Sequence, residues 1–307
     1  MIDGVRLLLP RQKGMDLAGK LRDYRRLDTH TGSGKLGALK VSHNLDGLTI
    51  YGSLPKYLNG ENVTPLVRAG VKAAIEKLEN ELAVDLSQAI VSMVEVGKTF
   101  ILKHPPGEYL RLFGDHPRYR KCVTTKAGTV ETVLYDLPKS SYQFQGYDKT
   151  KEMRAKRKAM PELFVGCKVL RLEWRCRRRR GLQGRFGRDI TCHELFEYET
   201  YYKLKACFWA AYKAVEKLGR EVFVDKTKPL TPSLLQRLMA EAHRQHHNDN
   251  YNDYLGAYID YGLLTKKNVE RIRAENRRRG RDYSMSDKNP LIEELDSFVE
   301  MAAVRGA

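Results

Sequence analysis

The 307-residue sequence predicts an α+β fold, in which a mixed domain over residues 1–185 is followed by a helical region over residues 186–307. Two observations predict this division. Short runs of strand composition, separated by turns and short helices, fill the first part of the chain. Longer stretches of helical spacing follow the glycines of segment 181–187. Strands followed along the chain by helices are typical of α+β proteins.

Short apolar or β-branched runs bounded by turn residues predict the strands. In chain order they cover residues 5–9, 36–41, 48–54, 89–102, 129–135, 141–148 and 165–177. The second and third runs flank residues 44–47, which tolerate left-handed backbone, so we expect a turn between them. The last run is the strongest strand pattern in the chain.

Helical spacing and end signals predict the helices. Thr64 and Pro65, a hydroxyl cap and a proline in the first turn, begin a helix with one apolar stripe that continues to Leu82. Shorter helices are expected at 107–113 and 149–160. Gly181, Gly184 and Gly187 predict a loop. Beyond it, helices are expected at 192–218, 232–244 and within 251–279.

The composition limits the class of protein and its partners. Lys and Arg number 55 against 38 Asp and Glu, which leaves a formal charge of +17 and favours a polyanionic partner. No apolar run approaches the roughly 20 residues that cross a bilayer, so we expect no membrane association and a cytoplasmic location. The five cysteines contain no CxxC pair, which argues against a disulfide framework or a structural zinc site.

Two glutamates on expected strands are candidate metal ligands. Glu95 lies between Val94 and Val96, and period-two alternation turns it away from their apolar face. Glu173 shares one face of its strand with arginines, which keep a carboxylate ionised and able to bind a hard cation. A solvated side chain is the alternative for Glu95, and a surface strip of ion pairs is the alternative for Glu173.

Tyr147 is the candidate nucleophile. Lys149 follows two residues later on the same face, and a phenol can attack a phosphodiester when a neighbouring cation stabilises its anion. Tyr142 is the rival, but its opposite parity places it on the other face of a regular strand unless Gly146 marks a bulge. A strand-edge tyrosine without a chemical role is the alternative in a chain with 17 tyrosines.

The order of four segments resembles the replication initiation proteins of the filamentous-phage gene II/X family and their plasmid-borne relatives. These segments are residues 1–10, segment 48–63 with its proline, lysine and Gly-x-Asn, Tyr147-Asp148-Lys149 with Glu152, and Arg171-Leu172-Glu173. The chain departs from the family at the acidic strand, where Met93-Val94-Glu95 replaces Arg-Ile-Asp. The resemblance covers about residues 1–180.

The resemblance implies an antiparallel-sheet nuclease domain related to the HUH endonucleases, which starts rolling-circle replication on single-stranded or origin DNA. It implies that Tyr147 attacks the scissile phosphate, leaving a 5′-phosphotyrosyl link and a free 3′-hydroxyl. Lys149 would stabilise the developing charge, and Glu95 and Glu173 would help to bind Mg2+ or Mn2+. Since some initiators alternate two tyrosines, Tyr142 is a candidate secondary tyrosine.

The histidines of this chain do not follow the pattern of the HUH metal site. HUH enzymes carry a His-x-His motif, and this chain has none. His43 and His104 lie nearest the expected strands and are the candidate histidine ligands. His104 lies nine residues past Glu95, roughly 30 Å along extended chain, so a regular strand cannot bring both to one metal. The site could therefore consist mostly of carboxylates.

Two basic stretches, 149–158 and 175–180, flank Tyr147 and could line a groove for phosphates on either side of it. The candidate DNA-binding residues are Arg171, Arg175, Arg177, Arg178, Lys151 and Arg154. A third basic cluster, 271–281, lies at the end of an expected helix that starts near Thr265. It could be a DNA-reading helix of the C-terminal region, but no helix-turn-helix signature favours that over a surface helix.

Two other functions remain open at this point. One is a non-catalytic DNA-binding protein on the same scaffold, and the other is an RNA-binding protein whose Tyr and Arg residues stack on bases. Segment 32–35, Gly-Ser-Gly-Lys, lacks the spacing of an ATP-binding loop, so unwinding would require a separate host helicase. The oligomeric state is not predicted.

Overall fold

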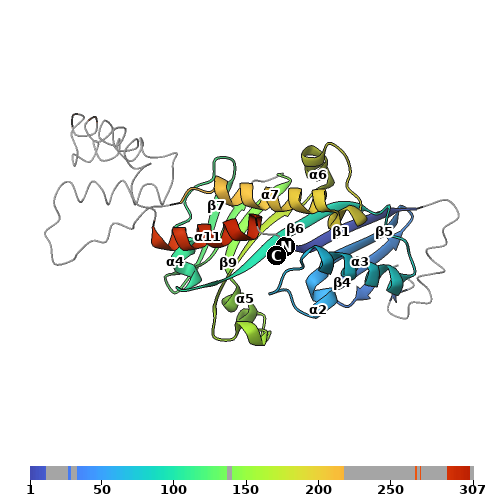
Figure 1. Ribbon diagram of the computed structural model, residues 1–307, viewed down its shortest axis with the longest axis horizontal. Helices are drawn as coiled ribbons and strands as arrows, with labels where there is room; N and C mark the ends of the chain where they lie inside the picture. The colour runs from blue at the N-terminus through green and yellow to red at the C-terminus, as the bar shows by residue number, and fades with distance from the viewer. Residues whose placement is uncertain are drawn as a thin grey trace. The chain divides into compact units, whose positions relative to one another are not determined.

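The computed structural model describes residues 1–11, 27–28, 33–136, 140–217, 267, 270 and 289–304 (Figure 1). Met1–Glu216 and Glu294–Ala307 form one compact unit, and Lys217–Glu293, of which few residues are described, form a second. The boundary between these two units follows Glu216, and the expected domain boundary near residue 185 stays a prediction. The expected helix 232–244 and the basic cluster 271–281 lie outside the described residues, as does nearly all of segment 251–279.

One antiparallel sheet forms the centre of the first unit. Its described strands are β1 (Ile2–Pro10), β2 (Leu27–Asp28), β3 (Ser33–Leu36), β4 (Leu39–Asn44), β5 (Gly47–Ser53), β6 (Ile90–Leu102), β7 (Arg120–Lys126), β8 (Thr129–Asp136), β9 (Tyr142–Asp148) and β10 (Lys168–Cys176). Their order is β2-β3-β4-β5-β1-β6-β10-β9-β8-β7. The predicted α+β class with an antiparallel sheet is confirmed, and β1, β6, β10 and β9 are neighbours although they are far apart in sequence.

Helices cover the sheet and cap its ends. The described helices are α2 (Leu54–Asn59), α3 (Arg68–Leu82), α4 (Pro106–Arg111), α5 (Lys149–Ala155), α6 (Arg179–Phe186), α7 (Tyr198–Ala214) and α11 (Pro290–Val304), with short 3₁₀ turns η1 (Glu162–Phe164) and η2 (His193–Phe196). None of the helices that the structure describes is long and apolar enough to cross a membrane.

Residues 181–186 belong to helix α6 and do not form the expected loop. Gly181 allows close packing there, because a Cβ on it would lie 2.5 Å from the Ser141 Cβ and 2.7 Å from the Cys176 Sγ. Gly187 has a positive φ of 74° and ends the helix in the left-handed conformation that favours glycine. The glycines therefore serve packing and helix termination.

Two other elements differ from expectation. Helix α3 begins at Arg68 rather than near Thr64, because Leu66 forms a β-bridge with Ile2 and Val67 is extended. Strand β7 was not expected, because it pairs only with β8 at the edge of the sheet and its residues are mostly exposed, so it has no apolar alternation.

The two faces of the central strands differ in character. On one face Val94, Val96 and Trp174 are buried, and Phe144 contacts Phe208 of α7 with ring centres 6.2 Å apart. The other face carries polar residues. Figure 1 shows α6 and α7 on one side of these strands and α5 on the other. Period-two alternation thus gives the sheet an apolar face under α7 and a polar face beside α5.

Candidate active site

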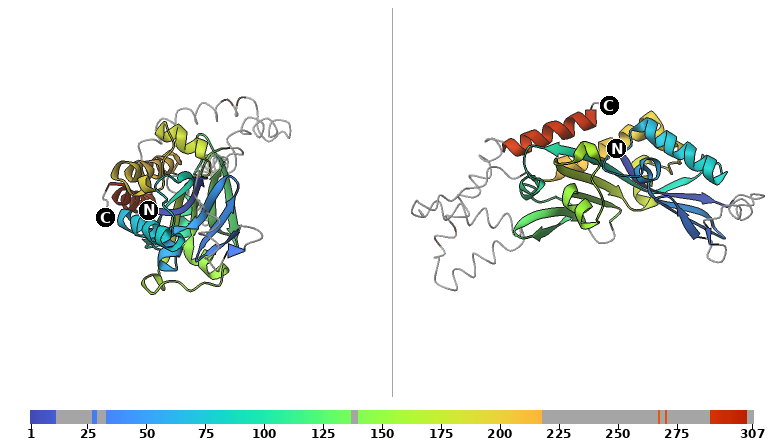
Figure 2. Two further views of the ribbon diagram at one scale, coloured as in Figure 1. Left: turned by 90° about the vertical axis from the view of Figure 1, so that its right-hand side faces the viewer. Right: turned by 90° about the horizontal axis from the view of Figure 1, so that it is seen from below.

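A pocket of about 620 Å³ opens on the polar face of the sheet. Residues of β1, β5, β6, β8, β9 and β10 line it, together with residues of α2 and α5. The right-hand view of Figure 2 looks from the side of α5. The charged lining residues are Asp3, Glu95, Glu131, Asp148, Glu152 and Glu173 and the cations Lys56, Lys151, Lys156 and Arg175. The pocket therefore has carboxylates on its strands and on α5, and lysines on or beside its helices.

Glu173 is the most connected carboxylate of the pocket. Its Oε1 accepts hydrogen bonds from the Tyr147 hydroxyl at 2.8 Å and from Arg171 Nε at 3.1 Å. Its Oε2 accepts from Gln145 Nε2 and lies 3.5 Å from an Arg175 guanidinium nitrogen. Burial acts to raise the pKa of Glu173, but the two guanidinium groups and the hydrogen bonds outweigh it and lower that pKa. Glu173 is therefore a buried, ionised carboxylate.

Glu95 lies beside Glu173 on β6, where it is paired in register with Arg175 of β10. Arg175 Nε donates to Glu95 Oε2 at 2.5 Å. Burial and the neighbouring Glu173 carboxylate raise the pKa of Glu95 to about 7, although Arg175 acts in the opposite direction. Glu95 is therefore the carboxylate of this pair that holds a proton near neutral pH.

Asp3 joins these two glutamates because of a bulge in β1. Ile2 pairs with Val96 and Val5 pairs with Val94, so Asp3 and Gly4 both lie opposite Glu95. Sequence reading did not single out Asp3, because strict alternation would place it on the apolar face with Val5. An acidic residue within that apolar run was the available signal, since a buried charge requires partners.

The partners of Asp3 come from three separate segments. Ser53 Oγ donates to its Oδ1 at 2.5 Å, and Asn62 Nδ2 and an Arg171 guanidinium nitrogen donate to its Oδ2 at 3.3 and 2.6 Å. None of these donors lies next to Asp3 in sequence. The carboxylate is therefore fixed by tertiary contacts, and only 2% of the residue is exposed.

Arg171 connects the carboxylates from within the sheet face. Its fully buried guanidinium bonds to Asp3, Glu173 and the Thr99 hydroxyl. Gly97 makes room for it, because a Cβ there would lie 2.7 Å from the nearest guanidinium nitrogen. The expectation that Arg171 contacts DNA phosphates is therefore wrong, since the guanidinium has no access to solvent.

Tyr147 extends from β9 toward the same carboxylates. Burial and the nearby Glu173 charge raise the pKa of its phenol well above the ordinary value of 10. Lys149 is the first residue of α5 and is only 1% exposed. Its Nζ lies 5.7 Å from the centre of the Tyr147 ring, 2.9 Å from Glu152 Oε2 and 3.2 Å from Asn62 Oδ1. The phenol is therefore protonated at rest, with a buried ammonium beside its ring.

Tyr142 lies on the opposite face of β9, as parity predicts. Its ring stacks on Trp174 with centres 5.8 Å apart, and its hydroxyl donates to the Gly181 carbonyl oxygen at 2.7 Å. Gly146 does not reverse this arrangement, because β9 pairs with β10 without a register shift. The structure therefore does not bring the two tyrosines to one site.

The structure does not bring His43 or His104 to the carboxylates. His43 lies on β4, which β5 separates from β1, and pairs in register with Leu48. His104 follows the far end of β6, where its half-exposed ring lies 3.7 Å from Glu108. Neither histidine lines the pocket.

The three carboxylates fit a hard divalent cation. Asp3, Glu95 and Glu173 each offer an oxygen, and these oxygens lie within 4.8 Å of one another. Mg2+ and Mn2+ prefer such oxygen ligands. Once Glu95 has lost its proton, the three carboxylates together with the neighbouring Arg171 and Arg175 have a net charge of −1. Arg175 is 29% exposed and can turn away from Glu95, whereas Arg171 is enclosed.

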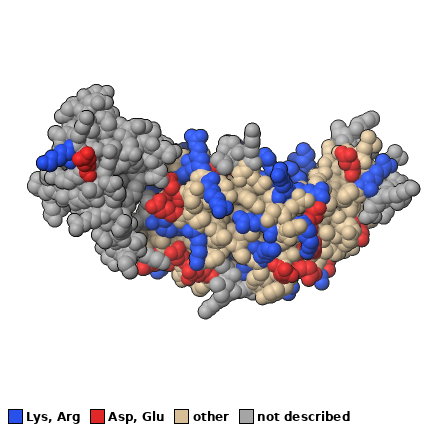
Figure 3. Space-filling model, turned by 90° about the horizontal axis from the view of Figure 1, so that it is seen from above, with Lys and Arg blue, Asp and Glu red and all other residues tan. Residues whose placement is uncertain are grey.

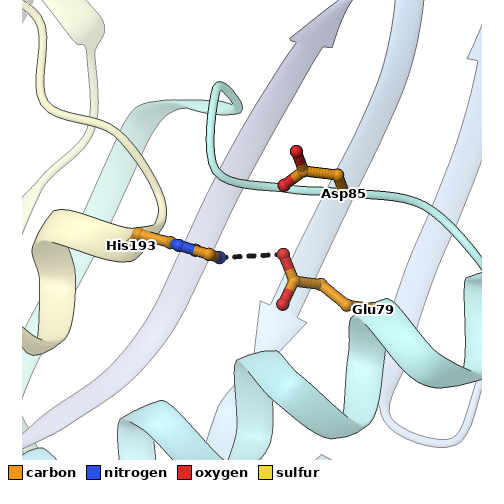
Figure 4. Close-up of side chains that lie close together, drawn as sticks. All are labelled: Glu79, Asp85 and His193. Atoms are coloured by element: carbon orange, nitrogen blue, oxygen red, sulfur yellow. Dashed lines mark hydrogen bonds and ion pairs between the residues drawn. The ribbon is translucent and has the colours of Figure 1, made fainter.

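A second cluster of possible ligands, Glu79, Asp85 and His193, is explained by structural contacts (Figure 4). His193 Nε2 and the Leu86 amide both lie 2.8 Å from Glu79 Oε1. Asp85 accepts hydrogen bonds from the Ser87 amide and hydroxyl. These bonds hold η2 and the turn after α3 together, and none of the three residues lines the pocket.

The remaining basic candidates divide between the two sides of the sheet. Lys151 lines the pocket and lies 3.2 Å from Glu131, while Arg154 is exposed on the same helix. Arg177 forms a bidentate pair with Asp136 at 2.6 and 3.0 Å. Arg178 lies at the start of α6, so the structure does not place it beside Tyr147.

The fold and the site together define a class of protein: an antiparallel-sheet protein whose pocket joins a tyrosine, a carboxylate cluster and lysines. A family comparison identifies the class more closely. The model of the N-terminal part of the gene II replication-associated protein family matches residues 9–190, and the chain belongs to this family. The match includes Glu95, Tyr147 and Glu173, whereas Asp3 precedes it.

Two further comparisons do not define the family more closely. A search of curated proteins found no match. A search of solved structures matched the rolling circle replication initiator protein from Geobacillus stearothermophilus, with 13% sequence identity and a TM-score of 0.36. That match covers 78% of this chain and 95% of the other.

Proposed function

We propose that this replication-associated protein starts rolling-circle replication by nicking one strand of its origin DNA with Tyr147. One observation carries the proposal: the Tyr147 hydroxyl donates to the buried Glu173 carboxylate beside two further carboxylates, inside a pocket with lysines. A nucleophile held by a proton acceptor, with cations close by, is the arrangement that attack on a phosphodiester requires.

In the proposed reaction the Tyr147 oxygen attacks the scissile phosphorus. The phenolic proton passes to Glu173 Oε1, which already accepts its hydrogen bond. The new bond joins the tyrosine oxygen to phosphorus, and the bond from phosphorus to the 3′-oxygen breaks. The products are a 5′-phosphotyrosyl link and, after protonation by solvent, a free 3′-hydroxyl. Attack by a 3′-hydroxyl on that link reverses the step and rejoins strands.

The lysines would bind and orient the DNA. Lys56, Lys151 and Lys156 line the pocket, where they can neutralise the phosphates next to the scissile bond. Lys149 is buried next to the Tyr147 ring and would offset the negative charge that develops on the phenol oxygen. The resting pKa of Tyr147 is raised, so we expect DNA and metal binding to be needed before attack.

Asp3, Glu95 and Glu173 would hold Mg2+ or Mn2+. When bound, the ion would polarise the scissile phosphate and offset charge on the leaving oxygen. Arg171 would keep Asp3 and Glu173 in place, because it bonds to both from a fully buried position. A separate helicase of the host would be the further partner, because the chain has no ATP-binding loop.

The test is a denaturing gel of the purified protein with Mg2+ or Mn2+ and labelled single-stranded DNA from the origin of its own replicon. The wild type and Tyr142→Phe should both yield a labelled protein–DNA adduct, and Tyr147→Phe should yield none. Glu79→Gln is a matched control, because it alters the other carboxylate cluster. A wild type that gives neither adduct nor nick with either ion would contradict the proposal.

One observation favours a second candidate. Arg171 and Arg175 already neutralise most of the carboxylate charge, as they would in a structural network of ion pairs. A non-catalytic protein that binds DNA or RNA on the same scaffold would keep this network and bind no metal. Binding of origin DNA or of a structured RNA without any cleavage would support this candidate.

A further inference from the structure

Helix α6 and the neighbouring part of α7 carry cations that the candidate active site does not use. The exposed members are Arg178, Arg180, Arg185 and Lys203. They lie on the side of the sheet away from Tyr147, because Gly181 of α6 packs against Tyr142 and Cys176 of the apolar face. We call these four side chains the α6 surface.

Aromatic rings, and not carboxylates, hold two of these cations. The Arg185 guanidinium carbon lies 5.0 Å from the centre of the Tyr142 ring, and Lys203 Nζ lies 4.8 Å from the centre of the Phe186 ring. A ring orients a cation without cancelling its charge. Arg185 and Lys203 are thus held in place while their positive charge stays available to an anion.

Two other arginines of the same segment are neutralised. Arg179 pairs with Asp189 through two hydrogen bonds of 2.6 and 2.7 Å, and Arg188 pairs with Glu194. All of these arginines belong to one short stretch of chain. The segment therefore contains two kinds of exposed arginine: Arg179 and Arg188 form ion pairs, whereas Arg178, Arg180 and Arg185 form none with the described residues.

We propose that the α6 surface is a second nucleic-acid-binding surface, which takes the phosphate backbone of double-stranded DNA. Figure 3 views the side of the molecule from which α6 projects, and Lys and Arg side chains are spread across its middle. Cations arranged on a helix bind phosphates without reading bases. Single strands are bound by open aromatic faces on which bases stack, whereas here Arg185 and Lys203 cover the rings of Tyr142 and Phe186.

The inference rests on the proposed function, since it gives the protein two contacts with origin DNA. The pocket would take the strand to be cut, and the α6 surface would anchor duplex on the other side of the sheet. Because the two surfaces are separate, a substitution on α6 should weaken duplex binding and leave the pocket intact.

The experiment compares two double variants that remove equal charge from one segment. The exposed-arginine variant, Arg178→Ala/Arg180→Ala, alters two exposed arginines that form no ion pair with the described residues. The paired-arginine variant, Arg179→Ala/Arg188→Ala, alters two exposed arginines that do form ion pairs. Fluorescence anisotropy would measure the affinity of the full-length protein for a duplex of roughly 30 base pairs over a range of salt concentrations. The same proteins would be titrated with a short single-stranded oligonucleotide, and thermal unfolding would confirm that each is folded.

The exposed-arginine variant should lose about 1.8 from the slope of log affinity against log salt, because each phosphate contact contributes about 0.9. When salt rises from about 50 to about 200 mM, the affinity of the wild type for duplex should therefore fall by a factor about 12 times larger than the affinity of this variant. Its single-strand affinity should match the wild type, and the paired-arginine variant should keep the wild-type slope.

Equal losses in both variants would overturn the inference, because net charge rather than the α6 surface would then control binding. An unchanged duplex slope in Arg178→Ala/Arg180→Ala, or an equal loss of single-strand affinity, would also overturn it. Duplex binding is measured without cleavage. A protein that forms no tyrosyl adduct but shows the expected slopes would therefore contradict the proposed function and support the second surface.

Discussion

The raised pKa of Glu95 makes the stability of the metal-free protein depend on pH. In the unfolded chain this carboxyl loses its proton near its ordinary pKa of 4.5, whereas in the folded protein it holds the proton to about pH 7. Between these values the unfolded state binds fewer protons than the folded state. The free energy of unfolding therefore falls as pH rises through this window.

The size of this effect follows from the two pKa values. Each pKa unit corresponds to about 1.4 kcal/mol, so the difference between 4.5 and about 7 gives a loss of about 3 kcal/mol from acid to neutral pH. The side chain of Glu95 is 13% exposed, so solvent screening reduces this free-energy change only slightly. Glu95→Gln has no proton to lose and should remove the loss.

The assay is urea unfolding of wild type and Glu95→Gln in EDTA at several pH values across this window. The difference in free energy of unfolding between the two proteins should change by about 3 kcal/mol across the window. Taking this difference cancels the titration of all groups that the two proteins share. Glu79→Gln is the control, and its free energy of unfolding should change with pH as that of the wild type does. A difference between wild type and Glu95→Gln that stays constant with pH would refute the reasoning.

Three further predictions concern the neighbours of this cluster. Gly97→Ala should cost about 1–3 kcal/mol of unfolding free energy and slow nicking, because the new Cβ would displace the Arg171 guanidinium; unchanged urea midpoints and nicking rates would contradict this. Asp3→Asn should weaken Mn2+ binding in isothermal titration calorimetry, because one of three carboxylate charges is lost; wild-type affinity would exclude Asp3 as a ligand. Tyr142→Phe should lower the free energy of unfolding, measured by thermal unfolding, by about 1 kcal/mol, because the hydrogen bond to Gly181 is lost. It should leave the nicking rate unchanged.

The sequence was most informative about the central strands. Alternation placed Glu95 and Glu173 on faces away from apolar neighbours, and the structure brings both to one pocket with Tyr147. Parity also separated Tyr147 from Tyr142. These expectations depended on local period-two patterns, which persist wherever a strand is regular.

Irregular backbone and long-range pairing could not be predicted in the same way. The bulge that turns Asp3 into the pocket depends on how β1 pairs with β6, about 90 residues later in sequence. Arg171 resembled a surface cation, because nothing local shows that Gly97 leaves space for it beneath the carboxylates. The α6 segment resembled a loop because its glycines serve close packing against the sheet.

Peptide mass spectrometry of the protein–DNA adduct tests the central claim most directly. Tryptic cleavage after Lys139 and Lys149 would release residues 140–149, a peptide that contains both Tyr142 and Tyr147. After reaction with origin oligonucleotide and Mn2+, fragmentation of this peptide should place the nucleotide on Tyr147. Attachment to Tyr142 or to any other residue would contradict the account, as would an unmodified peptide in a preparation that has cut its DNA.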